Sequence, residues 1–277
     1  MTHNNRSRSA DRLHVVYEDE HLIVIEKPSG LLSVGFPGHR GKTAHGVLEH
    51  MYKARGKGEV FVVHRLDRDT SGLMLFARTS QVRDRLMDEW HNLVSERIYR
   101  CVCRRRSRAA PLPDSGIIDA CIAYNRHDVG FVPGGDDRAS RAKAEKAITR
   151  FTVLERGPCL DLIECALETG KKNQIRVHMA HLGHPLAGDS VYGDETTHDG
   201  LEIGRLALHA RVLAFCHPVD GTLLCFESPE PASFSELARR TGRISREKPD
   251  PACTLDRPHR STRSGQPGGG SRFIPGR

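Results

Sequence analysis

The sequence contains no run of 18 or more apolar residues, so it predicts no membrane-spanning helix. Its first residues, MTHNNRSRSADR, also lack the apolar segment that a secretory signal requires. The eight cysteines form no CxxC pair, and the spacing of Cys101 and Cys103 does not suit a zinc knuckle. Aromatic residues make up only 5% of the chain, which argues against a broad base-stacking platform. Together these absences predict a cytoplasmic protein whose thiols are reduced and mostly buried.

Positive charge is concentrated at the two ends of the chain. Lys and Arg total 42 against 35 Asp and Glu, a formal charge of +7, of which residues 1–9 carry +2, residues 245–277 carry +4 and the stretch between them only +1. The last stretch is rich in Pro, Gly, Ser and Arg without apolar periodicity, which is typical of disorder. We therefore predict a disordered N-terminus over 1–10, one folded domain over 11–244, and a disordered basic tail over 245–277.

Segments with strand patterns outnumber segments with helical patterns. This balance, with helices inserted irregularly, predicts an α+β fold with a mixed, largely antiparallel central sheet and flanking helices rather than a regular βαβ alternation. In the segment 80–93 apolar residues recur at spacings of three and four, and Thr79 or Ser80 could cap a helix there. Strands are predicted over 13–17, 22–26, 60–63, 72–77, 98–102, 117–123, 147–154, 160–167 and 222–227, and helices over 43–52, 80–93, 174–182 and 231–240.

A charged loop, HRLDRDTSG over residues 64–72, lies between two predicted strands. A sheet fixes such a loop while leaving its side chains exposed, which suits a reactive group. Asp67 stands between Arg65 and Arg68, and nearby guanidinium charge favours a carboxylate that stays ionised and can act as nucleophile or base. On charges alone, a β-turn with a solvated cluster of ion pairs is the more common interpretation.

A basic segment follows the predicted strand 160–167. Lys171, Lys172, Gln174 and Arg176 would gather at the start of a helix, where backbone N–H groups also attract anions. The pattern indicates a phosphate or carboxylate site, and a basic helix start on a solvated face is an equally good interpretation.

Three histidines lie in or just after this predicted helix. His178 and His181 share one helical face, whereas His184 comes next to Pro185, beyond the end of the helix. No HExxH arrangement is present, so packed or hydrogen-bonded histidines are favoured over a metal site.

Two arginine-rich stripes complete the candidate surfaces. Residues 96–108 contain six arginines, one acid and Tyr99, and residues 138–150 contain five basic residues and one acid. Basic stripes beside an aromatic residue suit RNA, whose phosphates need charge and whose extruded bases need a stacking surface. The alternative for either stripe is a solvated protein face.

Five blocks of the chain, taken together, resemble the RluA family of pseudouridine synthases. HRLDRDTSGLMLFAR (64–78) is similar to the family's HRLDxxTSG signature, and TGKKNQIRVHMAHLGHPLAGDSVYG (169–193) to its TGRxHQIRxHxxxxGHPxxGDxxYG block. The other matching blocks are VVYEDEHLIVIEKPSGLLS (15–33), ERIYRCV (96–102) and RLALHARVLAFCHP (205–218). The resemblance spans about residues 13–229 in the order found in the family.

This resemblance implies the pseudouridine synthase fold and an enzyme that isomerises uridine in RNA to pseudouridine, with no metal or cofactor. The N-glycosidic bond breaks, the uracil turns while bound, and C5 bonds to the ribose. By resemblance, Asp67 is the catalytic aspartate, Arg176 is the arginine that pairs with it, and Tyr99 packs on the target base and helps to remove the C5 proton. Arg65 matches a position that fills the gap left by the flipped base, a role suited to a planar guanidinium.

The chain departs from the family pattern at three positions, which bear on substrate contacts rather than on Asp67 or Arg176. Lys171 stands where the family has Arg, Arg97 stands where the family has Lys, and Asn173 stands where the family has His. The N-terminus is too short for the S4-type RNA-binding domain of many relatives, so we expect the catalytic domain, over 11–244, to recognise RNA, with or without a contribution from the basic tail. The expected RNA-binding residues are Arg65, Arg68, Lys171, Lys172 and Gln174.

The expected partner is tRNA, large-subunit rRNA or both, and the expected form is a cytoplasmic monomer. One alternative is a non-catalytic RNA-binding or RNA-remodelling protein on the same fold, which the presence of Asp67, Tyr99 and Arg176 opposes. Another is a metal hydrolase that uses the histidines near residue 180, which their spacing does not favour.

Overall fold

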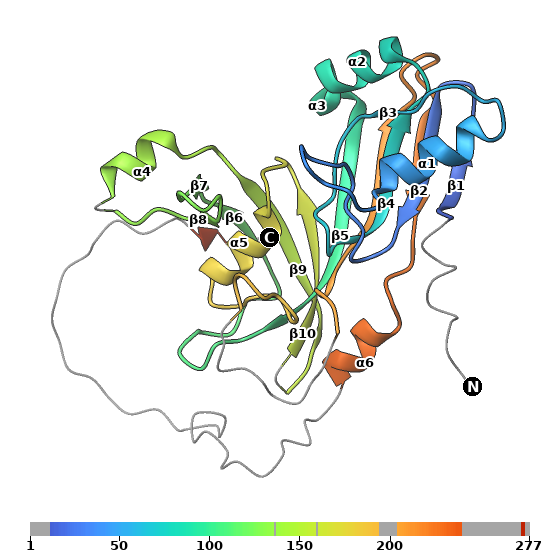
Figure 1. Cartoon of the computed structure of the whole chain (residues 1–277). Coiled ribbons are helices and arrows are strands. Elements are labelled where there is room, and N and C mark those ends of the chain that lie inside the picture. The colour runs from blue at the N-terminus through green and yellow to red at the C-terminus, as the bar shows by residue number, and fades with distance from the viewer. Residues whose placement is uncertain (1–11, 136, 159, 194–203, 240–272, 275–277) are drawn as a thin grey trace, which may run out of the picture. The chain divides into compact units, whose positions relative to one another are not determined.

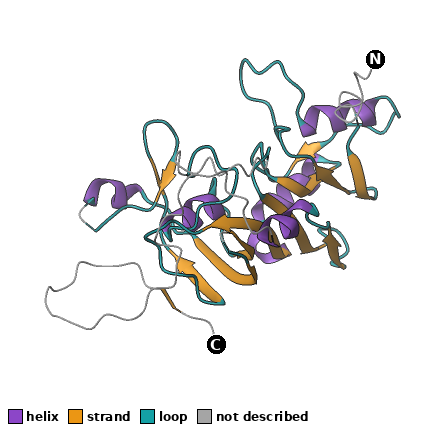
Figure 2. Ribbon diagram, turned by 90° about the horizontal axis from the view of Figure 1, so that it is seen from below, coloured by secondary structure: helices purple, strands orange, loops and turns teal. Residues whose placement is uncertain are grey.

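The computed structural model describes residues 12–135, 137–158, 160–193, 204–239 and 273–274 (Figure 1). The chain divides into two compact units, each built from two stretches of sequence: unit 1 comprises residues Met1–Arg100 and Leu208–Pro231, and unit 2 comprises Cys101–Ala207 and Ala232–Arg277. Strands are the main regular structure and the helices are short (Figure 2). No helix among the described residues is long and apolar enough to cross a membrane. The predicted domain limits, residues 11 and 244, and nearly all of both predicted tails lie outside the described residues.

Unit 1 is a sheet with strand order β1-β2-β4-β11-β5, in which β3 adds to β4 and β12 adds to β11. The pairs β1·β2, β2·β4, β3·β4 and β11·β12 are antiparallel, whereas β4 and β11 run parallel. Its elements are β1 (His14–Glu18), β2 (Leu22–Lys27), α1 (Ala44–Lys53), β3 (Phe61–Val62), β4 (Ser71–Ala77), α2 (Ser80–Asp88), α3 (Trp90–Leu93), β5 (Val94–Arg104, which continues into unit 2), β11 (Leu208–Cys216) and β12 (Leu223–Glu227).

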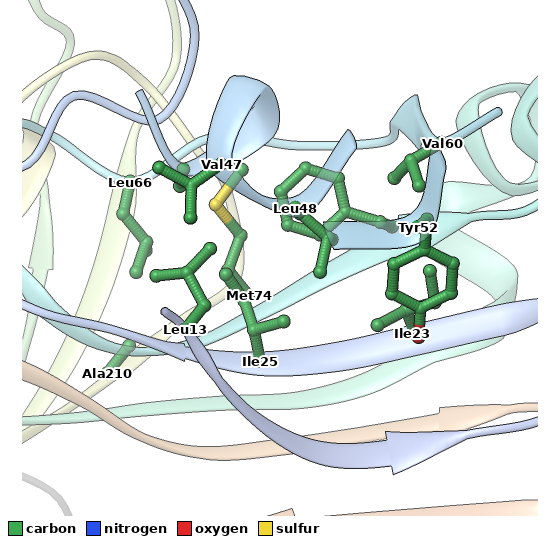
Figure 3. Packing of buried hydrophobic residues seen from close by; sticks show 12 residues of the cluster. Leu13, Ile23, Ile25, Val47, Leu48, Tyr52, Val60, Leu66, Met74 and Ala210 are labelled. Atoms are coloured by element: carbon green, nitrogen blue, oxygen red, sulfur yellow. The ribbon is translucent and has the colours of Figure 1, made fainter. Parts of the chain in front are cut away.

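Both faces of the central strands of unit 1 are buried. On β2, Ile23 and Ile25 pack into the cluster beneath α1, whereas Leu22 and Val24 pack into the cluster that contains residues of α2. Side chains alternate between the two faces of a strand, so a strand covered on both sides reads as a continuous apolar run, here LIVI and LMLFA. Figure 3 shows the first cluster, with Leu66 at one edge of it.

The helix starts of unit 1 follow capping chemistry. The Thr43 side chain accepts a hydrogen bond from the Gly46 amide (3.0 Å), and Thr79 accepts from the Val82 amide (3.2 Å), so Thr79 rather than Ser80 is the cap. The helix predicted over 80–93 is two helices, because the backbone leaves the helical region at Glu89 (φ −101°, ψ 17°).

Unit 2 is built on antiparallel pairs, β10 with β9, β9 with β6, and β6 with β13. Helix α6 packs through Phe234 and Leu237 on Leu160 and Leu162 at the start of β10. The elements are β6 (Ser115–Asp119), β7 (Ala123–Tyr124), β8 (Gly130–Phe131), α4 (Arg138–Lys143), β9 (Ile148–Arg156), β10 (Leu160–Leu167), α5 (Gln174–His181), α6 (Ser233–Arg239) and β13 (Phe273–Ile274). The prediction of an α+β fold with a mixed, largely antiparallel sheet is confirmed.

The thiols differ from their prediction. Of the six cysteines whose placement is described, Cys101, Cys103 and Cys165 are buried, whereas Cys121 and Cys225 are exposed. Cys225 lies on the outward side of β12, where every second residue faces solvent. The prediction of mostly buried thiols therefore holds for only half of the described cysteines.

Candidate active site

The loop that carries Asp67 joins β3 to β4, as the sequence predicted. Leu66 is 4% exposed and belongs to the cluster beneath α1, while Asp67 is half-buried and Arg65 and Arg68 are exposed. The amide of Thr70 donates to the Asp67 carbonyl (3.2 Å), which closes a turn directly after the aspartate. Asp67 thus follows an anchored residue and begins a defined turn.

A buried lysine holds the backbone of this loop. Lys27, at the end of β2, is fully buried, and its Nζ donates to the carbonyls of Pro28 (3.0 Å), Leu31 (2.7 Å) and Arg68 (2.9 Å). An ammonium group has three N–H donors, and a buried charge is tolerated when its hydrogen bonds are made. Lys27 therefore ties the segment after β2 to the segment after Asp67.

Two serines and a glycine of the same segment add further ties. Ser33 Oγ donates to the Leu66 carbonyl (2.6 Å) and accepts from the Leu66 amide (3.1 Å). Ser29 Oγ donates to the Asp69 carbonyl (2.7 Å), and the Gly30 amide donates to the Arg68 carbonyl (3.0 Å). The loop backbone is therefore fixed immediately before and after Asp67.

We expect Lys27→Met to lower the free energy of unfolding by about 2–4 kcal/mol, because the three hydrogen bonds made by its buried ammonium group are lost. Chemical denaturation measures this change. The matched control is Lys53→Met, since the Lys53 side chain is 64% exposed and pairs with Glu49 on the surface, so a change within about 0.5 kcal/mol is expected. Equal effects of the two substitutions would contradict the role given to Lys27.

The far end of the loop is fixed by a buried histidine. His209 Nδ1 lies 2.8 Å from Ser71 Oγ, and Nε2 lies 3.1 Å from both the carbonyl and the hydroxyl oxygen of Ser228. A carbonyl oxygen can only accept, so these partners assign the proton to Nε2 and leave Nδ1 to accept from the Ser71 hydroxyl. Ser228 in turn hydrogen-bonds the Glu26 carboxylate.

His64, the first residue of the loop, is a neutral anchor. The Leu75 amide donates to its Nε2 (2.9 Å), and its ring contacts that of Trp90 at 5.0 Å between centroids. Burial, together with the positive charge of Arg97, lowers the pKa of His64 to about 4. The imidazole is therefore uncharged at neutral pH and acts as an acceptor.

Tyr99 lies on β5 and packs against the same cluster as Leu66. Burial raises the pKa of Tyr99 to about 12, against the opposing effect of Arg97, and the negative charge of Asp67 adds to the rise. Unit 1 thus brings Tyr99 into electrostatic range of Asp67. A phenol with this pKa is ionised in only about one molecule in 10⁵ at neutral pH, so Tyr99 packs as a neutral phenol.

Arg176 lies on α5 in unit 2 and is held in one orientation. Its Nε and Nη2 donate to the two carboxylate oxygens of Asp189 (2.7 Å each), and its Nη1 donates to Asn173 Oδ1 (2.8 Å). The guanidinium also lies over the Tyr192 ring, 5.0 Å from its centroid. Asn173 adopts the left-handed conformation (φ 56°), which Asn tolerates better than most residues. The departure from the family pattern at position 173 therefore has a structural role.

We expect Arg176→Lys to lower kcat roughly 100-fold, because an ammonium keeps the charge but cannot bind Asp189 in two places. A steady-state assay of the pseudouridine formation that the sequence resemblance implies measures this change in kcat. Arg150→Lys is the control, since the Arg150 side chain is 57% exposed and pairs with Glu168 on the surface. A wild-type kcat in Arg176→Lys would show that the two hydrogen bonds from Arg176 to the Asp189 carboxylate are not needed.

The predicted RNA-binding residues of unit 2 are engaged within the protein. Gln174 is 2% exposed: its Oε1 accepts from Thr169 Oγ1 (2.8 Å) and from the Lys171 amide (2.9 Å), and its Nε2 donates to the Ile148 carbonyl (2.9 Å). This placement makes Gln174 a support for the start of α5 rather than a surface contact. The Lys171 ammonium pairs with Glu145 and that of Lys172 with Asp128, both at partly exposed positions.

The first arginine-rich stripe contains structural residues as well as exposed ones. Arg106 donates to the carbonyls of Ala180 (3.4 Å) and Tyr192 (3.2 Å), which fastens its loop to the end of α5. Arg105 and Arg108 are exposed.

His178 in α5 and His184 just after it are buried and hydrogen-bonded, as predicted. His178 Nδ1 lies 2.9 Å from Thr149 Oγ1, and Nε2 lies 2.9 Å from the Ala120 carbonyl. His184 Nε2 lies 3.0 Å from the Ala110 carbonyl. Within the described part of the chain, no group of three or more His, Cys, Asp or Glu residues is placed to hold a metal ion.

The buried His178 should make stability depend on pH. Burial lowers the pKa of His178 to about 4, against the raising effect of the Ala120 hydrogen bond, and its unfolded value is about 6.5. The unfolded chain therefore binds this proton first as the pH falls, so stability present above pH 6.5 is lost towards pH 4, by up to about 1.4 kcal/mol per pH unit. Denaturation at a series of pH values gives the free energy of unfolding as a function of pH. This free energy should fall less steeply between pH 6.5 and pH 4 in His178→Gln than in wild type. The control His127→Gln, at an exposed position, should show the wild-type dependence.

Sequence reasoning missed the positioning roles of several residues: Lys27, Ser33, Asn173, Asp189 and His209. All five stand inside blocks that carry the family resemblance, so the sequence marked these positions without showing what they do. The role of Lys27 depends on a hydrogen bond to a residue 41 positions away, which no local pattern reveals.

Comparison with known proteins identifies relatives along most of the chain. The family model for RNA pseudouridylate synthases matches residues 21–181. YlyB of Bacillus subtilis, described as an uncharacterized RNA pseudouridine synthase, is 37% identical over 229 residues, which cover 81% of this chain and 71% of that protein. Ribosomal large subunit pseudouridine synthase D of Nitrosomonas europaea is 35% identical over 250 residues, covering 86% and 68%. The solved structure of human RNA pseudouridylate synthase domain containing 1 has a TM-score of 0.64 at 20% identity, covering 83% and 87%, so the fold is shared.

A family model over residues 21–181 and relatives 35–37% identical place the chain in a class of RNA-modifying enzymes. Since the family model matches more than half of the sequence, the chain belongs to the RNA pseudouridylate synthase family, and the resemblance to RluA enzymes is confirmed. It is accordingly an enzyme that acts on RNA and isomerises uridine to pseudouridine.

Proposed function

We propose that this enzyme modifies uridine in large-subunit ribosomal RNA and that Asp67 is its catalytic group. The observation that carries the assignment of Asp67 is the fixed backbone on either side of it, at Leu66, Arg68 and Asp69, while Asp67 as a residue is only half-buried. Such a group is both positioned and accessible. The choice of RNA is supported by the name of a relative 35% identical, a ribosomal large subunit pseudouridine synthase.

In the proposed reaction the target uridine is first extruded from its stack, since C1′ is unreachable within a helix. With the carboxylate of Asp67 at the ribose, the N1–C1′ bond breaks and its electron pair stays on the uracil. The uracil turns, C5 bonds to C1′, the proton on C5 is lost to solvent water and N1 takes up a proton, so that substrate and product are isomers. Tyr99, neutral and packed beside the loop, holds the uracil by contact with its face.

A role for Arg176 in the reaction is part of the same proposal. It is supported by the way Asp189 and Asn173 hold the guanidinium in one orientation, since a positive charge that is already oriented needs little reorganisation during the reaction. Arg65 and Arg68, both exposed beside Asp67, are proposed to contact the RNA, Arg65 in the space left by the extruded base. We also propose that the enzyme acts as a monomer in the cytoplasm, where it meets ribosomal RNA.

The test of the RNA substrate compares unmodified transcripts of large-subunit rRNA and of tRNA, with pseudouridine mapped by chemical labelling and reverse transcription. We expect new pseudouridine at one or a few positions of the large-subunit transcript. Modification confined to tRNA would overturn the choice of RNA while leaving the chemistry intact. Light scattering of the purified protein tests the monomer.

A further inference from the structure

A turn in unit 1, between β2 and α1, exposes an aromatic ring. Phe36 is 61% exposed and is the one aromatic residue among the exposed large hydrophobic side chains of the described part of the chain. Phenylalanine is normally among the more buried residue types, and aromatic residues make up only 5% of this chain. The exposure of Phe36 is unexplained by packing.

The local sequence fixes the geometry of this turn. The His39 amide donates to the Phe36 carbonyl (2.9 Å), Pro37 restricts φ at the second position, and Gly38 supplies the positive φ (86°) that a type II turn needs at the third. The ring of His39 lies 5.1 Å from that of Phe36. A Cβ at Gly41 would come within 2.8 Å of the His39 ring, so the glycine leaves room for it. The two rings are therefore held together before any ligand arrives.

The charge around the turn favours a polyanion. Arg40 and Lys42 are exposed, and the segment 28–48 contains no Asp or Glu. An exposed aromatic ring flanked by cations offers a stacking surface for a base and charge for the adjoining phosphates. A protein partner would need a larger apolar patch than one ring.

The turn is also close to the catalytic loop along the chain. Ser33, which hydrogen-bonds Leu66 beside Asp67, is three residues before Phe36. Three residues span at most about 10 Å, so a base stacked on Phe36 belongs to the RNA immediately around the target.

We propose that Phe36, backed by His39, stacks on an unpaired base that flanks the target uridine, while Arg40 and Lys42 bind phosphates of the same strand. This inference rests on the RNA function proposed above and adds a contact that selects unpaired over paired flanking sequence. Base stacking needs a flat ring, whereas apolar packing needs only size.

The experiment compares Phe36→Leu, Phe36→Tyr and Phe36→Trp in the full chain. The probes are a labelled RNA stem-loop with an unpaired, uridine-containing loop and a fully paired duplex of the same stem. We expect Phe36→Leu to raise the Kd for the stem-loop about tenfold with little change for the duplex. Phe36→Tyr and Phe36→Trp should retain wild-type affinity, and the indole fluorescence of Phe36→Trp should be quenched by the stem-loop. Met87→Ala, at another exposed apolar position of unit 1 (54% exposed), is the control and should bind both RNAs as wild type does.

The proposal is overturned if Phe36→Leu binds the stem-loop as wild type does, if it loses affinity for both RNAs equally, or if it changes only the oligomeric state, which would make the turn a contact between copies. Binding and quenching are read without turnover. A wild-type enzyme that forms no pseudouridine would therefore refute the proposed function, while these two readouts still decide whether Phe36 stacks on RNA.

Discussion

Asp67→Asn is expected to reduce the rate of pseudouridine formation by about 10⁴-fold or more, the largest effect of any single substitution on activity. The amide has the shape of the carboxylate but lacks the negative charge that attacks C1′ or stabilises the positive charge developing there. Because Lys27, Ser29 and Ser33 hold the loop through its backbone, the substitution should leave the fold intact. Single-turnover assays on unmodified large-subunit rRNA measure the loss, and RNA affinity should stay within about twofold of wild type.

Asp69→Asn is the matched control for this prediction. Asp69 is an exposed residue of the same loop, and the contact that fixes it is made by its backbone carbonyl rather than its side chain. The same change of charge two residues from Asp67 should therefore leave the rate nearly unchanged. If Asp67→Asn retained activity within tenfold of wild type, another group would have to perform the chemistry.

Gly72→Ala is expected to have the largest effect on stability, a loss of about 4 kcal/mol or more in the free energy of unfolding. Gly72 has a φ of 111°, and a Cβ there would lie 2.1 Å from the carbonyl oxygen of Ala210 on the parallel neighbour β11. Neither strand can move away cheaply, because both carry buried residues of the core. Urea denaturation followed by circular dichroism gives the measurement.

Gly30→Ala separates backbone strain from the clash. Gly30 also has a positive φ (83°), but a Cβ there would meet nothing within 4 Å. Its substitution should cost only about 1–2 kcal/mol, the usual penalty for a residue with a side chain in this region. If the two alanines were equally destabilising, the close approach of β4 and β11 would not be the cause.

The sequence predicted the fold best where one physical signal dominated. The strand 160–167 has the same bounds in the structure. The strands predicted over 22–26 and 72–77 are one residue short, and their uninterrupted apolar residues with turn residues at the ends mark strands covered on both faces. Helix α4 was missed because none of its residues is buried, so no apolar periodicity could reveal it. Strand β11 was missed because its histidine and arginine interrupt the apolar pattern, although His209 is buried by bonds to Ser71 and Ser228.

The sequence predicted the candidate catalytic residues, but not the interactions that hold them in place. Asp67, Tyr99 and Arg176 stand in motifs, and the structure adds what motifs do not hold: the raised pKa of Tyr99 and the fork between Arg176 and Asp189. Gln174 was expected to bind RNA because a polar residue at a helix start looks exposed in a sequence. It is instead buried, because its side chain makes four hydrogen bonds to β9 and to the turn before α5.

The most direct test of the proposed chemistry is tritium release from large-subunit rRNA labelled at C5 of uridine. Moving the glycosidic bond from N1 to C5 requires that the hydrogen on C5 be lost, whereas binding or remodelling of RNA leaves it in place. Wild-type enzyme should release tritium in step with the pseudouridine it forms, and Asp67→Asn should release none above background. Tight binding of the same RNA by the wild-type enzyme with all tritium retained would contradict the proposal.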